Sequence, residues 1–270
     1  MTRLFDMIPF RLCAARVFRW AFFFFFLGAA LACGGADSPS PTTATATVSS
    51  RPATVIGFVG GFVKPDAHVH STVQLAEHLR RSYPAGVYVR VFENHHGDQA
   101  YRELLRHLDA DNDGSLSPEE KRQARIIIYG HSWGASETVT LARKLEKAGI
   151  PVLLTIQVDS VSKGGENDAV IPANVAQAVN FYQPHGLVHG RSQIRAADPE
   201  HTEIVGNFRF DYSQNPVSCD GYPWFNHFFI RPHIEIECDP KVWTQVEALI
   251  QSKLSPDVQA SVTAVPVRAH

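Results

Sequence analysis

The chain has 270 residues, of which 44% are hydrophobic and 19% charged, so it is long enough and apolar enough to form one sizeable domain. This composition excludes a disordered chain, a collagen-like repeat and a small scaffold held together mainly by disulfides. The formal net charge is only −2, so the charge balance does not favour a nucleic-acid partner.

Residues 1–32 are typical of a secretory signal peptide. Arginines precede an apolar run from Trp20 to Ala32, and the run ends in Ala30-Leu31-Ala32, which satisfies the small-x-small cleavage rule. The run is shorter than the roughly 20 residues that span a bilayer, so a permanent transmembrane helix is the weaker interpretation. The sequence therefore predicts export from a bacterial cell.

Cys33 directly follows the predicted cleavage point. The preceding Ala-Leu-Ala resembles the lipobox of bacterial lipoproteins, in which this cysteine carries the lipid, although leucine three positions before the cysteine would be more typical. Residues 33–53 are rich in Pro, Ser, Thr and Ala, which favours a flexible tether before a domain at 54–270. We expect a periplasmic or outer-surface lipoprotein anchored to the membrane through Cys33, or a secreted protein in which Cys33 is incidental.

Strand-type and helix-type runs alternate after the tether. This alternation favours an α/β fold, with a mainly parallel sheet covered by helices. The chain is less regular between residue 182 and a final amphipathic helix. The expected strands are 54–59, 87–92, 124–129 and 151–158, and the expected helices are 71–81, 99–108, 135–148, 173–182 and 242–254.

The strongest functional motif is Gly130-His131-Ser132-Trp133-Gly134. A β-branched strand precedes this G-x-S-x-G pattern and a helix is expected after it, a context in which a sharp turn exposes a serine hydroxyl. On this motif, residues 54–254 resemble the α/β-hydrolase superfamily. The resemblance implies an α/β-hydrolase fold with helices on both faces of the sheet, and a catalytic triad in the chain order serine, acid, histidine, with Ser132 as the nucleophile.

The resemblance also implies an oxyanion hole made of two backbone N–H groups. Trp133, which follows the nucleophile, supplies the first by its position. Gly60-Gly61-Phe62 ends the first apolar strand and lets N–H groups point into a cleft. We expect the Phe62 amide to be the second donor, with Gly61 as the alternative.

The acid is expected at the end of the strand that follows the nucleophile helix. Asp159 has this position, and the carboxyl ends of parallel strands are where such sheets carry their sites. The placement resembles that of the pancreatic-lipase branch of the superfamily. Asp168, Asp198 and Asp211 remain alternatives.

The chain has 13 histidines, so the base has to be selected by position. The superfamily histidine lies in a loop just ahead of the last helix, which favours His233, with His227 second. This histidine would accept the Ser132 proton and later deliver it to the leaving group, while Asp159 holds its other ring nitrogen.

Cys219 and Cys238 are the remaining cysteines of the predicted mature chain. Two such cysteines can pair in an oxidising compartment. We predict a Cys219–Cys238 disulfide, which would close the loop that carries His233. Two buried free thiols are the alternative.

Residues 109–120, DADNDGSLSPEE, match the twelve-residue calcium loop of EF-hand proteins. Only one such loop is readable, whereas EF-hands usually work in pairs, and this favours a structural Ca²⁺ ion over a calcium sensor. No organic cofactor is expected. The predicted ligands are Asp109, Asp111, Asp113, Glu120 and the backbone carbonyl of Ser115.

Together these features favour an exported serine hydrolase of the lipase or esterase type, which would cleave a small-molecule or lipid ester through an acyl-enzyme. The alternative is a non-catalytic calcium-binding surface lipoprotein that uses a hydrolase-like fold as a binding module, because fold alone does not fix function. An inert Ser132 would distinguish the second from the first. Aromatic residues at 222–229 are candidates for an acyl site, but their pattern is more typical of a core.

Overall fold

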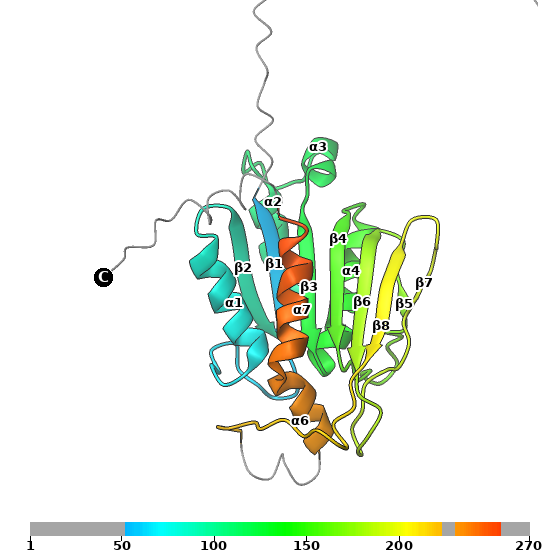
Figure 1. The fold of residues 1–270 in the computed structure, drawn as a ribbon. Coiled ribbons are helices and arrows are strands. Elements are labelled where there is room, and N and C mark those ends of the chain that lie inside the picture. The colour runs from blue at the N-terminus through cyan, green and yellow to red at the C-terminus, as the bar shows by residue number, and fades with distance from the viewer. Residues whose placement is uncertain (1–51, 223–229, 255–270) are drawn as a thin grey trace, which may run out of the picture. The chain divides into compact units, whose positions relative to one another are not determined.

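A parallel sheet forms the centre of the computed structural model, which describes residues 52–222 and 230–254 (Figure 1). The strands are β1 Ala53–Val59, β2 Val87–Glu93, β3 Ile126–His131, β4 Val152–Val158, β5 Val170–Ile171, β6 Val175–Tyr182, β7 Arg195–Ala196 and β8 Glu203–Arg209. Six of them form the main sheet in the order β2-β1-β3-β4-β6-β8, in which every neighbouring pair is parallel. The short strands β5 and β7 pair separately.

Helices cover both faces of this sheet. They are α1 Ser71–Ser82, α2 Gly97–Leu108, α3 Pro118–Arg122, α4 Trp133–Lys147, α6 Arg231–Cys238 and α7 Pro240–Gln251. Neighbouring residues of one strand point to opposite faces of the sheet. Ile127 belongs to the hydrophobic cluster formed with α1 and α7, and Ile128 to the hydrophobic cluster formed with α2 and α4. Because the central strands are buried on both sides, their sequences are continuous apolar runs.

The expected helix at 173–182 is wrong, since residues Val175–Tyr182 form strand β6 between β4 and β8. Apolar residues at Val175, Ala178, Val179 and Tyr182 have helical spacing, which suggested a helix. The structure instead buries 178–181 on both faces of the sheet. In such a strand the apolar residues need not alternate, so spacing alone does not separate it from a helix.

The parallel arrangement brings the carboxyl ends of the strands to one edge of the sheet. The segments after β1, β2, β3 and β4 all begin at this edge, where α6 also lies (Figure 1). The acidic loop at 109–120 and α3 lie at the opposite end, before β3 (Figure 1). The serine motif and the acidic loop are therefore separated by the length of β3.

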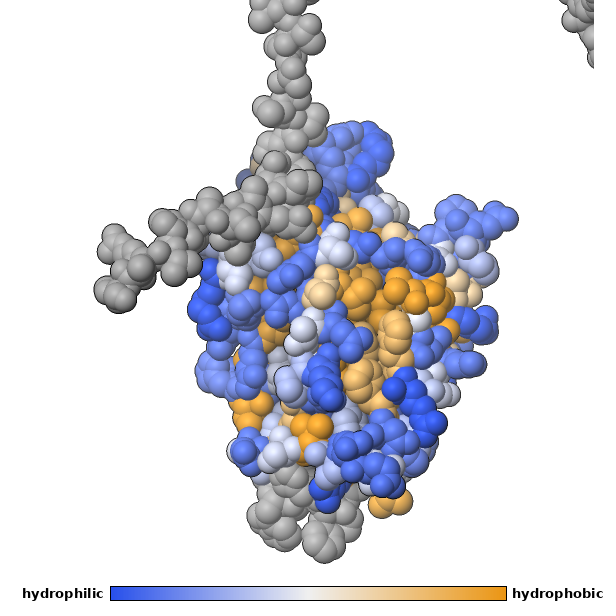
Figure 2. Space-filling view, viewed as in Figure 1, coloured by the Kyte–Doolittle hydropathy of each residue, from blue (hydrophilic) through white to orange (hydrophobic). Residues whose placement is uncertain are grey.

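Figure 2 shows apolar side chains gathered over β4, β6 and β8, beside the region that α1 and α7 cover in the same view. On β8, Val205 and Phe208 are 37% and 40% exposed. Within residues 52–222 and 230–254, no helix has both the length and the apolar character that crossing a bilayer requires.

Candidate active site

Ser132 lies on the sharp turn between β3 and α4. Its backbone has φ 57° and ψ −126°, a conformation that residues other than glycine rarely adopt. The flanking glycines permit the turn: a Cβ on Gly130 would lie 2.5 Å from the Gly134 carbonyl, and a Cβ on Gly134 would lie 2.2 Å from the Phe58 carbonyl oxygen. The motif therefore forms a tight strand-to-helix elbow with the serine at its apex.

Three residues predicted to be catalytic lie in one hydrogen-bonded row. The Nε2 atom of His233 lies 2.8 Å from the Oγ atom of Ser132, and its Nδ1 atom lies 2.6 Å from Oδ2 of Asp159. All three residues are buried. With Nδ1 protonated and bound to Asp159, the Nε2 atom is free to accept the serine hydroxyl hydrogen.

His233 lies in the first turn of α6, not in a loop ahead of the last helix as predicted. The last two helices are separated by Asp239, which has ψ 110° and caps α7 by accepting a hydrogen bond from the Lys241 N–H. A residue before proline is disfavoured in the helical conformation, and Pro240 imposes this on Asp239. The chain therefore breaks there, and the segment with His233 forms a short helix of its own.

Asp159 is held from several directions. Its Oδ1 atom accepts hydrogen bonds from the backbone N–H groups of Gln183 and Gly190, at 3.0 and 2.8 Å, and its Oδ2 atom accepts one from Nε2 of Gln183 at 2.9 Å. A Cβ on Gly190 would lie 2.3 Å from Oδ1, so the glycine makes room for the carboxylate. These donors fix the carboxylate toward His233.

The three alternative acids have other partners. Asp168 is buried against Ser160 and Arg191. The carboxylates of Asp198 and Asp211 pair with histidines other than His233. His227 lies outside the described residues, as do Cys33, the signal peptide and most of the aromatic segment. Among the described residues, Asp159 is thus the candidate acid that His233 contacts.

The two residues predicted to supply the oxyanion donors, Phe62 and Trp133, line the same cleft. Trp133 is the first residue of α4, so its N–H has no acceptor within the helix, and no acceptor for the Phe62 N–H lies within the described part of the chain. The two rings form an edge-to-face pair with centroids 5.7 Å apart. Phe62 itself is 89% exposed.

A cleft of about 670 Å³ opens beside the serine elbow. Tyr222, the described member of the aromatic segment, is buried against His70 and does not line this cleft. Asn94 and Lys163 were missed by the sequence analysis, although Asn94 follows β2 at the same sheet edge. The lining residues are Gly61, Phe62, Asn94, His95, Trp133, Ser162, Lys163 and Gly164.

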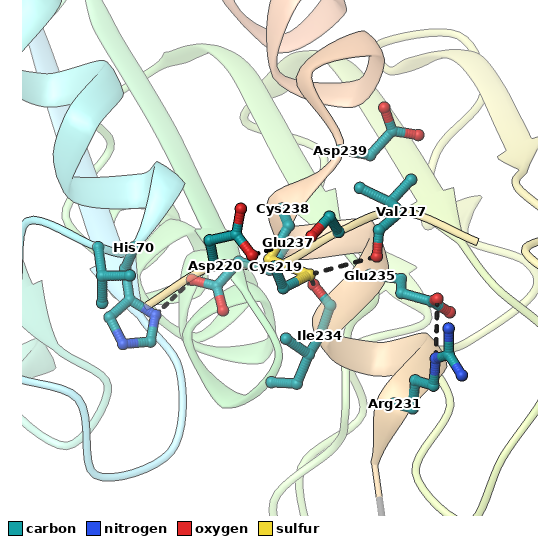
Figure 3. The surroundings of a disulfide bond; sticks show 12 residues. His70, Val217, Cys219, Asp220, Arg231, Ile234, Glu235, Glu237, Cys238 and Asp239 are labelled. Atoms are coloured by element: carbon teal, nitrogen blue, oxygen red, sulfur yellow. Dashed lines mark hydrogen bonds and ion pairs between the residues drawn. A yellow bond between two sulfur atoms is a disulfide. The ribbon is translucent and has the colours of Figure 1, made fainter. Parts of the chain in front are cut away.

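Next to the triad lies a buried group of polar residues. Glu237, four residues after His233 on α6, contacts Nδ1 of His70 at 2.8 Å (Figure 3). It also lies 3.4 Å from Nδ1 of His131. The His131 ring lies 4.6 Å from the His233 ring. Burial lowers the pKa of His131 to about 4, so this ring is neutral at physiological pH.

Cys219 and Cys238 form a disulfide in the structure, with their Cα atoms 5.6 Å apart (Figure 3). The bond ties the end of α6 to the segment around Cys219. Cys238 directly follows Glu237 in the sequence. The bond closes a segment of the chain that includes His233, and its two cysteines are the pair predicted from the sequence. His233, the predicted base, is therefore on a helix that is covalently held at one end.

The acidic loop brings three of its predicted ligands together. Carboxylate oxygens of Asp109, Asp111 and Glu120 lie within 4.8 Å of one another. The Asp113 carboxylate is not in this group, and it accepts hydrogen bonds from the N–H and hydroxyl of Ser115. Clustered carboxylate oxygens are the donors that Ca²⁺ prefers, so the residues fit this ion.

The chain is similar to several solved structures at low sequence identity. No family model matches, and no curated protein matches. The structure is similar to a thermostable esterase from Pseudomonas putida (11% identity, 78% of this chain and 77% of that one, TM-score 0.42) and to a cutinase-like protein from Cryptococcus (15%, 76% and 96%, 0.42). It is also similar to a putative hydrolase from Pectobacterium atrosepticum (13%, 76% and 94%, 0.39).

These identities and TM-scores are low, and they do not identify what the chain does. The fold class follows from the chain itself, through its six parallel strands, the helices on both faces and the elbow after β3. The described chain has an α/β-hydrolase fold.

Proposed function

We propose that this protein is an exported serine hydrolase that cleaves carboxylic esters through an acyl-enzyme. The observation that carries the proposal is the row of hydrogen-bonding atoms from Ser132 Oγ through His233 to Asp159, with distances of 2.8 and 2.6 Å. This geometry suits transfer of the serine proton to Nε2 as the oxygen attacks an ester carbonyl.

In the proposed reaction, Ser132 Oγ bonds to the carbonyl carbon while its proton passes to His233. The carbonyl oxygen becomes negatively charged and accepts hydrogen bonds from the Phe62 and Trp133 N–H groups. The ester C–O bond then breaks, and His233 returns the proton to the departing alcohol. Water then attacks the acyl carbon and gives a proton to the same histidine. The bond between the acyl carbon and Ser132 Oγ breaks, Ser132 Oγ takes that proton back from His233, and the acid is released.

The first test uses a fluorophosphonate probe on the purified mature protein, because this probe reports an activated serine without knowledge of the substrate. Wild type and Ser132→Ala would be compared in calcium and in chelator. We expect labelling of the wild type and none of Ser132→Ala. Absence of labelling in folded, calcium-loaded wild type would contradict the proposal and favour a non-catalytic binding module.

A panel of 4-nitrophenyl esters of graded acyl length would follow, to define the substrate class. The cleft beside Phe62 and Trp133 is open and partly aromatic, so we expect short and medium acyl chains to be cleaved. Hydrolysis of amides at a comparable rate, with no ester hydrolysis, would argue against an esterase.

We also propose that residues 109–120 hold one structural Ca²⁺ ion. Asp109, Asp111, Asp113 and Glu120 would supply carboxylate oxygens, and Ser115 its backbone carbonyl. The proposal is supported by the grouping of three carboxylates and by the Ser117 side chain, which caps α3 by accepting a hydrogen bond from the Glu120 N–H. Isothermal titration with CaCl₂ would test it, with Glu120→Gln as the variant expected to lose binding.

For location, we propose export by the signal peptide at 1–32 and lipid attachment at Cys33, with the secreted form as the alternative. The Cys219–Cys238 pair is compatible with an oxidising compartment. Metabolic labelling with a palmitate analogue in a bacterial host would separate the two. We expect label on wild type and none on Cys33→Ala, whereas an unlabelled wild type in the medium would support the secreted form.

A further inference from the structure

Asn94 holds the peptide that carries one of the proposed oxyanion donors. This residue follows β2, is 3% exposed, and its side-chain Nδ2 donates a hydrogen bond to the Gly61 carbonyl oxygen at 2.5 Å. In a planar trans peptide the carbonyl of one residue and the N–H of the next point in opposite directions. A hydrogen bond that fixes the Gly61 carbonyl therefore also fixes the direction of the Phe62 N–H.

The loop has few other restraints on this peptide. Gly61 has φ +49°, a Cβ at this position would meet nothing within 4 Å, and the Phe62 side chain is 89% exposed. The Val63 N–H bonds back to the Gly60 carbonyl, which closes the turn but leaves the intervening peptide plane unconstrained. Asn94 supplies the missing constraint.

Asn94 is itself held by two charged residues. Lys163 Nζ donates to the Asn94 backbone carbonyl and also lies 2.7 Å from Oε2 of Glu137. Glu137 is 4% exposed, and its carboxylate packs against Gly97 at the start of α2. A Cβ on Gly97 would lie only 1.8 Å from the Oε1 atom of Glu137. We call Asn94, Lys163 and Glu137 the brace.

The brace extends from the loop of one proposed donor to the helix that begins with the other. Glu137 belongs to α4, four residues after Trp133, the first residue of that helix. At the other end, Asn94 holds the peptide of Phe62. Burial raises the pKa of the Glu137 carboxyl and the neighbouring Lys163 ammonium opposes this, as in a buried ion pair that depends on both members.

We infer that Asn94 is a positioning residue for hydrolysis, and that Lys163 and Glu137 keep it in place so that the Phe62 and Trp133 N–H groups converge on one oxygen. This inference rests on the proposed function. It adds a polar connection from the nucleophile helix to the loop after β1, along one wall of the cleft.

The test compares wild type, Asn94→Ala, Asn94→Asp and Lys163→Met. Asn94→Asp keeps the size of the side chain but places an oxygen against the Gly61 carbonyl. In all three variants we expect kcat for 4-nitrophenyl butyrate to fall about 10- to 100-fold, while KM stays within about twofold of the wild-type value. This loss of kcat is smaller than the 10²- to 10³-fold loss that is typical when an oxyanion donor itself is removed. Phenylboronic acid, whose tetrahedral adduct places an oxygen in the hole, should bind more weakly by a similar factor.

Lys144→Met is the matched control. Lys144 of α4 lies 2.6 Å from Asp98 of α2, so it also forms an ion pair on the nucleophile helix. Among the described residues, this pair makes no hydrogen bond or ion pair with Asn94 or with residues 60–63. We expect its kcat and its affinity for phenylboronic acid to equal those of wild type. Melting temperatures of all variants would show that each is folded, and Asn94→Asp or Lys163→Met replaces Asn94→Ala if that variant does not fold.

The outcomes separate this inference from the proposed function. A wild type that neither reacts with fluorophosphonate nor hydrolyses esters overturns the proposed function and the inference with it. An active wild type whose folded Asn94 variants keep kcat within about twofold overturns the inference alone. So does a fall in kcat without any loss of affinity for phenylboronic acid, since that pattern places the defect outside the oxyanion hole.

Discussion

At the scale of single residues, backbone strain coincides with proposed function. Among the described residues, the non-glycine positions with positive φ are Asn112, Ser132 and Asp159, at 57°, 57° and 46°. The first lies in the acidic loop and the other two belong to the hydrogen-bonded row. Such conformations cost of order 1–3 kcal/mol each and persist where surrounding contacts enforce them. The buried partners of Asp159 provide this enforcement.

Replacing Asp159 tests the choice of acid. In Asp159→Asn the amide would favour the wrong histidine tautomer, so we expect kcat for 4-nitrophenyl butyrate to fall about 10³- to 10⁴-fold. Asp211→Asn is the control, because Asp211 is partly exposed and pairs with His185 and Arg209. A larger loss in Asp211→Asn than in Asp159→Asn would show that Asp211, and not Asp159, is the catalytic acid.

His131 should make the stability of the protein depend on pH. Its pKa is lowered from 6.5 to about 4 in the folded state, mainly by burial, although Glu237 opposes the shift. Below pH 6.5 the unfolded chain therefore binds this proton more readily than the folded chain. Stability should fall as the pH drops from 6.5 to 4, by about 3 kcal/mol at most from this group.

Urea denaturation at several pH values would measure this effect in wild type and His131→Asn. The variant should show a shallower loss of unfolding free energy between pH 6.5 and 4.5. The other charged or titratable groups around this ring are His70, Asp159 and His233. Equal slopes in the two proteins would mean that folding does not change the pKa of His131, and would contradict this prediction.

At the scale of elements, the order of strands and helices up to residue 158, apart from the short helix α3, was predictable because each has a distinct pattern. The same is true of the elbow, since a β-branched strand, two glycines and a helix determine it locally. Strand β6 was not, because a strand buried on both faces lacks alternation. The placement of His233 in α6 was not predictable either. The same holds for strand β8, because its largely exposed side chains give no strong periodicity.

The site could be predicted in part for a related reason. Ser132, Asp159 and Trp133 follow strands or begin a helix, so their positions are determined by neighbouring sequence. Asn94 is different, because its role depends on the pairing of β1 with β2 and on the Gly61 carbonyl. A hydrogen bond between two loops leaves no local pattern in the sequence.

Opening the Cys219–Cys238 bond should affect the helix that carries the proposed base, His233. For the 19-residue separation, chain-entropy estimates give about 3 kcal/mol of stabilisation. We therefore expect Cys219→Ser/Cys238→Ser to melt at lower temperature and, below that temperature, to have a reduced kcat because α6 is less restrained. Mass spectrometry with and without reductant would establish the bond in wild type, and an unchanged melting temperature in the double variant would show that packing alone holds α6.

At the scale of the whole molecule, the two proposed sites lie at opposite ends of β3. The strand has six residues, which corresponds to roughly 20 Å. An ion at the acidic loop can thus stabilise the start of β3 without contacting the triad. With this arrangement, we expect a bound ion to change the free energy of unfolding without changing the geometry of the triad.

Removal of calcium should accordingly lower the melting temperature more than the reaction rate. We expect EDTA to lower the melting temperature by several degrees, as a loss of about 1 kcal/mol does in domains of this size, with kcat at 25 °C nearly unchanged. Glu120→Gln should melt at the lower temperature with or without calcium. An equal melting temperature of wild type in calcium and in EDTA would contradict a structural ion.

The close packing around the serine elbow also limits which sequences can encode this protein. A Cβ on Gly60, Gly130 or Gly134 would come within 3 Å of neighbouring atoms, whereas a Cβ on Gly164 would meet nothing within 4 Å. In a saturation library selected for folded protein, the first three positions should return glycine almost alone, and Gly164 should accept many residues. Folding alone therefore requires glycine at these three positions, and this requirement would remain in related sequences that have lost catalytic activity.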